Sequence, residues 1–368
     1  MCTAINANTN IGSRIGSTDN VSRVRSALAG DEIVWTTEKF VEVRIKSRAI
    51  TQSTYDLIGI AEDVEDAIFN ISPKETPFLS MAKRKKASNT LHQWQTDALA
   101  AAAANRQVEG DDASFTTATP TTMLSNYTQI SRKTVIVSRT ADTVKKYGRA
   151  KELARLVTKY GAELKRDIEF ALVQNQASSA GGGATARSSA GLESMIAGNR
   201  IVASGNTTGT TPGYSGGVWS APTDGTATVT LTEALLISAL DAAWTDGGDP
   251  SIIMVNSGVK NDIAGFGGAS KFAGTYVPNQ GKSQSMVIGG VDLYISDFGE
   301  HKIMLNRHVR TRTLFAIDPE YVSVAFLDGI KMEDLAKTGD AEKKMLITEF
   351  CLVGDNPDAH AKVQDLAT

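Results

Sequence analysis

Ser215 lies in the stretch of the chain that most resembles a catalytic motif. Residues 213–217 read GYSGG, a spacing that places a nucleophilic serine on a sharp turn between a buried strand and a helix. The surrounding residues 204–226 are rich in Gly, Thr and Ser and hold few bulky apolar side chains. This composition predicts a loop or surface insertion. A hydrolase that uses Ser215 is an alternative. It would be eliminated if the protein had no hydrolase activity, or if its activity did not change when Ser215 was replaced.

A second short match, Gly281-Lys282-Ser283, resembles the end of a phosphate-binding loop. That loop needs a glycine five residues before Gly281, where this chain has Tyr276. We therefore interpret the match as a basic turn before a strand.

Metal and thiol chemistry find little support in the sequence. Neither Cys2 nor Cys351 has a partner at ligand spacing, and two cysteines do not support a disulfide framework. The four histidines are scattered, at His92, His301, His308 and His360. We predict no catalytic residue, no metal site and no cofactor.

The charge pattern offers one local basic run, which consists of Lys83, Arg84, Lys85 and Lys86. It could contact nucleic acid or an acidic neighbour, or form a solvated face. The whole chain has a formal net charge of −3, with 41% hydrophobic and 21% charged residues, so it lacks the basic excess of dedicated nucleic-acid binders. No apolar stretch reaches the length of a membrane span and no secretory signal is present, so we expect a protein made in the cytoplasm, without a membrane partner.

The strongest helical signal covers residues 143–176, which precede Gly181-Gly182-Gly183. Apolar residues recur there at steps of three and four, at Leu153, Leu156, Val157, Tyr160, Leu164, Ile168 and Leu172. We expect a long helix with one buried face and a polar face that carries Lys151, Arg155, Lys159, Glu163, Arg166 and Glu169.

Residues 97–126 form a long polar excursion between two predicted strands, 90–96 and 127–138. The alanines at 100–104 could form a helix capped by Asp97, but so short a helix is marginal alone, and its state stays open. Thirty small and polar residues cannot build a core of their own. We expect the excursion to be mobile or to lie on something else, with a neighbouring subunit as one candidate.

The remaining segments mix helices and strands and predict an α+β fold. Thr232 should cap a helix over 233–244, and residues 259–264 should form a helical turn. A strand is expected at 40–46 and a helix at 55–70 near the N-terminus. Later strands are expected at 251–255, 286–296, 302–306, 313–318, 322–327 and 344–353.

Several of these segments together resemble the major capsid proteins of tailed bacteriophages. The resemblance is carried by YDLIGIAEDV at 55–64, NISPKETPF at 70–78, TLHQWQ at 90–95, GAELKRD at 161–167 and NPDAH at 356–360. It covers residues 55–363, with an interruption at 204–226. Residues 1–54 lie outside it as either a true extension or translation from upstream of the start, and we favour the second.

The resemblance implies the Hong Kong 97-like capsid fold and a division of the chain. We expect an uncertain extension at 1–54, an N-terminal arm at 55–87, an extended hairpin arm at 88–138, a spine helix and peripheral domain with a flexible loop at 139–227, an axial domain at 228–330, and a return to the peripheral domain with the C-terminal tail at 331–368.

The resemblance also implies a function, which is to form hexamers and pentamers that close into an icosahedral head shell in the virion. The implied partners are other copies of the chain, a separate scaffolding protein, the portal and, without sequence specificity, packaged double-stranded DNA. Subunit contacts are expected at Trp94, Arg106, Glu109, Asp111, Asp112, Phe115, Tyr127 and Arg132, and an inner-face basic patch at Lys83 to Lys86.

Two features limit what is carried over from that family. Some relatives join subunits through a lysine on the extended arm, whereas no lysine lies between Lys86 and Lys133, so we do not expect that cross-link. Another virion structural protein, such as a tail-tube subunit, is the alternative, although a tube needs no spine helix.

Overall fold

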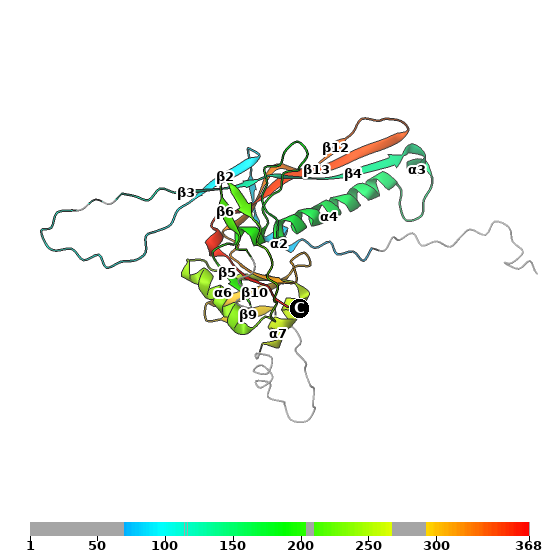
Figure 1. Ribbon diagram of the computed structural model, residues 1–368. Helices are drawn as coiled ribbons and strands as arrows, with labels where there is room; N and C mark the ends of the chain where they lie inside the picture. The colour runs from blue at the N-terminus through cyan, green and yellow to red at the C-terminus, as the bar shows by residue number, and fades with distance from the viewer. Residues whose placement is uncertain (1–69, 114, 116, 204–209, 267–291, 368) are drawn as a thin grey trace, which may run out of the picture. The chain divides into compact units, whose positions relative to one another are not determined.

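The computed structural model describes residues 70–113, 115, 117–203, 210–266 and 292–367 (Figure 1). The expected strand 40–46 and turn 281–283 lie outside the described residues, as does the expected helix 55–70 apart from its last residue. Every described residue belongs to one unit of the chain, Glu65–Thr368.

Helices and strands mix along the whole described chain. The helices are α2 (Pro77–Met81), α3 (Arg139–Thr143), α4 (Glu152–Val173), α5 (Leu192–Met195), α6 (Glu233–Thr245), α7 (Ser257–Gly265) and the 3-10 turn η2 (Pro357–Ala359). The strands are β1 (Lys83–Lys86), β2 (Leu91–Thr96), β3 (Thr122–Tyr127), β4 (Gln129–Ser138), β5 (Arg200–Val202), β6 (Gly213–Ser215), β7 (Val218–Ser220), β8 (Ile252–Val255), β9 (Leu293–Ser296), β10 (Gly299–Leu305), β11 (Thr313–Ile317), β12 (Val322–Asp334), β13 (Ala341–Gly354) and β14 (Ala361–Gln364).

A four-stranded sheet in the order β1-β12-β13-β4 packs one face against α4. Residues of a strand alternate between the two faces. On β4, Val135 and Val137 are buried, whereas Ile130 and Ile136 on the other face are half or more exposed. Among the described residues, a helix therefore covers this sheet on one side only.

A six-stranded sheet, in the order β5-β14-β11-β8-β10-β9, forms the second layer of the fold. Ile253, Val255 and Leu314 on one face pack in a cluster with residues of α6 and α7. Met254 and Phe315, which alternate with them, belong instead to the cluster around α4. The alternation along β8 and β11 thus joins the two sheets through one continuous core.

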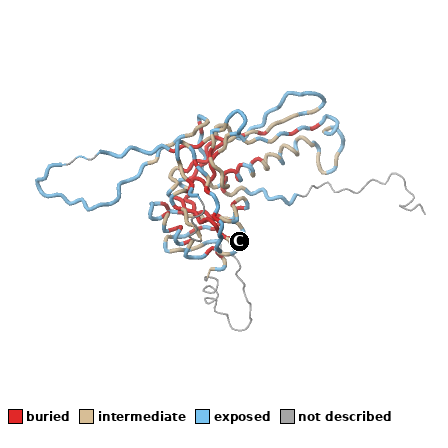
Figure 2. Tube along the Cα trace, viewed as in Figure 1, coloured by how far each residue is buried: buried red, intermediate tan, exposed pale blue. Residues whose placement is uncertain are grey.

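Strands β2 and β3 form a separate ribbon, with Leu91 opposite Tyr127 and Thr96 opposite Thr122. Between them lie residues 97–121, here called the arm, whose described residues form no helix or strand and are all exposed (Figure 2). The alanine run at 100–104 is not helical. Five alanines without a packed face cannot offset the entropy of ordering a helix.

The long helix begins at Glu152, so the predicted start at residue 143 is wrong. The chain forms the short helix α3, leaves helical geometry over 144–151, where Gly148 has φ +69°, and then enters α4. Asp142 explains the new start, because its Oδ1 accepts from the N–H groups of Glu152 at 2.8 Å and Leu153 at 3.3 Å. A side chain from outside α4 therefore satisfies the first free N–H groups of the helix.

Three further expectations can be compared with the structure. Thr232 caps α6, since its side chain accepts from Leu235 N, as predicted. The expectation of an unpacked loop at 204–226 is wrong for the described part, because β6 and β7 form a hairpin that buries Trp219. The placement of Glu169 on a polar helix face is also wrong, because this side chain is fully buried.

Candidate functional site

The middle of the arm is an acidic turn, which we define by Glu109, Asp111 and Asp112. Asp111 N donates to Val108 O at 3.2 Å, and Gly110 has φ +84°, a value that the third position of a type II turn requires. All three acidic side chains are exposed. Their carboxylates form no ion pair within the described residues.

Apolar side chains on the arm are exposed to a degree unusual for a folded chain. The exposed fractions are 99% for Leu99, 78% for Val108 and 97% for Phe115. Arg106 is exposed beside them. The predicted contact residues of the arm therefore lie on one exposed segment. This segment does not pack against the rest of the described subunit.

The other predicted contact residues lie elsewhere. Trp94, on β2, is half-buried and packs against two core clusters of its own chain. Tyr127 is half-buried at the end of β3, where it pairs with Leu91. Arg132 is exposed on β4, on the sheet face away from α4. The structure thus does not gather the eight predicted residues into one surface.

The basic run forms the edge strand β1, which pairs in parallel with β12. Lys83 Nζ donates to Glu320 O at 3.2 Å, and Lys85 pairs with Asp355 at 2.5 Å. Arg84 and Lys86 alternate with these two lysines and are exposed on the opposite face of the strand. Within the described chain, Arg84 and Lys86 have no hydrogen-bond or ion-pair partner, whereas Lys83 and Lys85 do.

Ser215 ends β6 in a tight hairpin. Gly216 and Gly217 have φ of +60° and +86°, as a two-residue type I′ turn requires. Strand β7 follows where a nucleophile elbow would have a helix. Instead, the hairpin holds the ribbon, because Tyr214 OH lies 2.8 Å from Ser125 Oγ and Trp219 Nε1 donates to Ser125 O at 2.8 Å.

Glu169 connects the segment before β1 to α4, a role that the sequence analysis missed. Its carboxylate accepts from Phe78 N and Leu79 N, each at 2.8 Å, and from Asn306 Nδ2 at 2.6 Å. Burial raises the pKa of Glu169, and the three donors oppose that rise. A sequence signal existed, since Glu169 stands next to Ile168 and three residues before Leu172 at the border of the apolar stripe.

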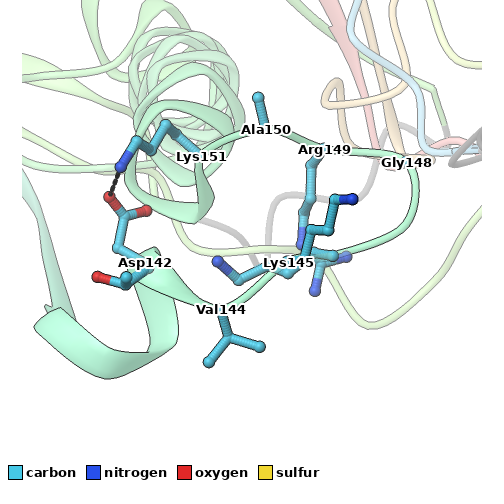
Figure 3. Close-up of a pocket in the computed structure, with 9 residues that line it drawn as sticks. Asp142, Val144, Lys145, Gly148, Arg149, Ala150 and Lys151 are labelled. Atoms are coloured by element: carbon cyan, nitrogen blue, oxygen red, sulfur yellow. Dashed lines mark ion pairs between the residues drawn. The ribbon is translucent and has the colours of Figure 1, made fainter.

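The connection between α3 and α4 surrounds an open hollow of about 680 Å³, which we call the basic hollow (Figure 3). Lys145, Lys146, Arg149 and Lys151 line it, with Asp142 as its one acidic side chain. Lys151 reaches Asp142 at 3.3 Å. The sequence analysis missed this feature because it extended the helix through these residues.

Other chemistry finds little support in the described residues. These residues include no group of His, Cys, Asp and Glu that could hold a metal ion. Burial raises the pKa of Cys351 to about 12, with Glu349 as a smaller cause, so this thiol stays protonated and unreactive. No helix in the described part is long and apolar enough to cross a membrane.

Comparison with known proteins connects this architecture to phage shells. The chain is 29% identical over 340 residues to the major capsid protein of Escherichia phage Phieco32, a match that covers 83% of this chain and 94% of that relative. Its structure resembles the cyanophage A-1(L) capsid asymmetric unit, with TM-score 0.60, 16% identity and coverage of 86% and 99% of the two chains. It also resembles a chain of Mycobacterium phage Bobi, with TM-score 0.56, 12% identity and coverage of 86% and 100%.

These structural likenesses confirm the predicted α+β, Hong Kong 97-like capsid fold. They do so at identities too low to show more than the fold. The sequence model of one family, described as the SU10 major capsid protein, matches residues 48–367. Since that match spans most of the 368 residues, the chain belongs to the SU10 major capsid protein family.

Proposed function

We propose that this capsid protein assembles with its own copies into hexamers and pentamers, which close into the icosahedral head that encloses phage DNA. The observation that carries the proposal is the arm. Its apolar side chains Leu99, Val108 and Phe115 are almost fully exposed in the single chain. An exposed, unpaired segment of this length fits a part that another copy covers.

Contacts between copies can offset the entropy cost of ordering the arm, which contacts within the single chain do not offset. Ordering the arm costs backbone entropy, which only contacts formed at the same time can balance. On a neighbouring copy, the arm can bury its apolar side chains and pair its polar groups. Each such contact is weak alone, but many become cooperative when a closed, symmetric particle forms.

We propose a purely structural role, without catalysis or a cofactor. The hairpin around Ser215 supports this, because its strand-turn-strand geometry lacks the helix of the nucleophile-elbow motif. The partners that we propose beyond other copies are a separate scaffolding protein, the portal and packaged DNA. We propose that the face of β1 that carries Arg84 and Lys86 contacts the packaged DNA. We also propose that the virion is assembled in the host cytoplasm.

The division of the chain into arms, spine helix, peripheral domain and axial domain also stays a proposal. The two sheets do not follow these proposed bounds strand by strand. The four-stranded sheet takes β1 from the proposed N-terminal arm, β4 from the proposed extended arm and the start of β12 from the proposed axial domain, whereas the six-stranded sheet takes β5 and β14 from outside the proposed axial domain. Met254 and Phe315 of the six-stranded sheet share a core cluster with the residues around α4.

A deletion tests whether the arm drives assembly. Replacing residues 97–121 with Asn-Gly joins the paired residues Thr96 and Thr122 by a two-residue hairpin turn. We expect a monomer with an unchanged urea midpoint that forms no shells in electron microscopy, in cells where the full-length chain forms them. Normal shells from the shortened chain would contradict the proposed role of the arm, and tubes from the full-length chain would favour the tail-tube alternative.

A further inference from the structure

The basic hollow carries more positive charge than its own surroundings neutralise. Asp142 is already committed to the N–H groups of Glu152 and Leu153 and to Lys151. Although burial opposes it, these three partners hold the pKa of Asp142 below its usual value. The hollow therefore contains no acid that is free to pair with its other lysines.

Two of the four basic side chains in the hollow lack an anionic partner in the described chain. Arg149 pairs with Glu152, and Lys151 pairs with Asp142. Lys145 is exposed and forms no ion pair, and Lys146 Nζ is shielded from solvent without a hydrogen-bond partner. A shielded ammonium group without a partner is costly, so this site favours a ligand that brings carboxylates or phosphates.

The arm carries a suitable set of carboxylates. Glu109, Asp111 and Asp112 place three acids within four residues, on a turn that projects at the middle of the arm. The chain arrives at β3 from the arm and leaves β4 into α3, and in Figure 1 the arm and α3 lie at opposite ends of this run. The acidic turn and the basic hollow of one copy therefore lie far from each other.

We propose that the acidic turn of one copy binds in the basic hollow of a neighbouring copy. The inference rests on the proposed shell function and names the partner of the arm. Lys145 and Lys146 supply the charge, and the turn closed by Gly110 presents carboxylates on both sides of its bend. Packaged DNA is the competing ligand for the same basic side chains, since phosphates would also satisfy them. The complementary charges within one sequence favour the arm.

A charge swap tests the pairing. Variant one combines Lys145→Glu with Lys146→Glu, and variant two combines Glu109→Lys with Asp111→Lys. We expect each alone to reduce the yield of shells at least tenfold, because it places like charges against each other. The variant with all four changes should recover most of the yield, since it restores opposite charges in reverse.

The control makes the same charge change elsewhere. Lys165→Glu with Lys302→Glu alters two exposed lysines that form no ion pair in the described chain, and we expect near-normal shells. The urea midpoint of every variant should match that of the unchanged chain. The inference is overturned if the variant with all four changes forms no shells although its monomer is folded. It is also overturned if the variant with Lys145→Glu and Lys146→Glu forms normal shells that hold less DNA.

Disulfide trapping gives a second readout that does not depend on yield. One preparation carries Asp111→Cys and another Lys146→Cys, both with Cys2→Ser, and the two are mixed before assembly. We expect a linked dimer from oxidised shells and none from unassembled subunits. Shells without the linked dimer would overturn the pairing and leave the shell function intact, whereas a failure of the unchanged chain to form shells would count against the proposed function itself.

Discussion

His360 shows how one buried side chain couples the fold to pH. Its ring is almost fully buried, and its Nδ1 accepts from Asp318 N at 3.1 Å. Burial lowers the pKa of His360 from 6.5 to about 4, while Asp318 acts in the opposite direction. The native state therefore holds this imidazole neutral at the pH of a cell, with Nδ1 as the acceptor.

The sign of the pH effect follows from the two pKa values of His360. Between about pH 6.5 and 4 the unfolded chain binds the proton and the native chain does not, so the free energy of unfolding falls as the pH falls. We expect His360 to contribute a loss of about 3 kcal/mol across this window. In His360→Asn, whose amide oxygen can still accept from Asp318 N, urea unfolding should depend less steeply on pH. An equal slope in both proteins would contradict the prediction.

The same scale shows which residue roles a sequence can reveal. Thr232 was predicted as a cap because capping depends on residues within one turn of the chain. The position of Glu169 at the border of the apolar stripe indicated burial, but its partners were not predictable, because Phe78 and Leu79 lie about ninety residues away in sequence. From the sequence alone, a charged residue inside a helix is predicted to be exposed, because the element that covers it is not known.

At the scale of elements, Glu169 holds α2 against α4. We predict that Glu169→Gln lowers the free energy of unfolding by about 2 to 3 kcal/mol, because an amide replaces one acceptor with a donor that faces the N–H groups of Phe78 and Leu79. Hydrogen exchange should also become faster in residues 77–86. Urea unfolding and exchange measurements check both effects.

A matched control lies on the same helix. Glu163→Gln removes a partly exposed carboxylate that approaches Lys133 and Lys159 only at 4.0 and 3.8 Å. We expect a change of less than about 0.5 kcal/mol, as for other surface ion pairs. Equal losses in the two variants would mean that the contact with α2 contributes nothing specific.

Local pattern predicted the existence of most elements better than their ends. The stripe of Leu164, Ile168 and Leu172 identified α4 correctly, since all three are buried. Its start was misplaced because the capping side chain, Asp142, lies ten positions before Glu152, on the far side of the loop 144–151. The hairpin of β6 and β7 was missed because Trp219 is its one fully buried side chain, and an average over a sequence window conceals a single buried aromatic residue among glycines.

At the scale of the whole molecule, the two faces of β1 differ. Lys83 and Lys85 contact other residues of the subunit, whereas Arg84 and Lys86 can contact another molecule. We predict that Arg84→Gln with Lys86→Gln lowers the salt dependence of binding to duplex DNA, with the slope of log K against log salt reduced by about 2. The urea midpoint should not change, because neither side chain has a partner in the described chain. Filter binding across a series of salt concentrations measures the slope.

The opposite pair on the same strand is the control. Lys83→Gln with Lys85→Gln removes the same number of charges from side chains that already contact Glu320 and Asp355. We expect an unchanged slope and a loss of stability of less than about 1 kcal/mol. If both pairs changed the slope equally, both faces of β1 would contribute to DNA binding, and the prediction that only the Arg84 and Lys86 face contributes would be wrong.

The order of strands in the four-stranded sheet also determines when the subunit can fold. Strand β13 lies between β12 and β4, and Ser138 of β4 pairs with Ala341 of β13. At a synthesis rate of about 5 to 20 residues per second, β4 waits roughly 10 to 40 s for that partner. Throughout this time the backbone edge of β4 that later pairs with β13 has no strand partner, although α4, which covers Val135 and Val137, is made directly after β4. The four-stranded sheet can therefore close only after the ribosome has reached the last strand of the subunit's long C-terminal hairpin, β12 and β13.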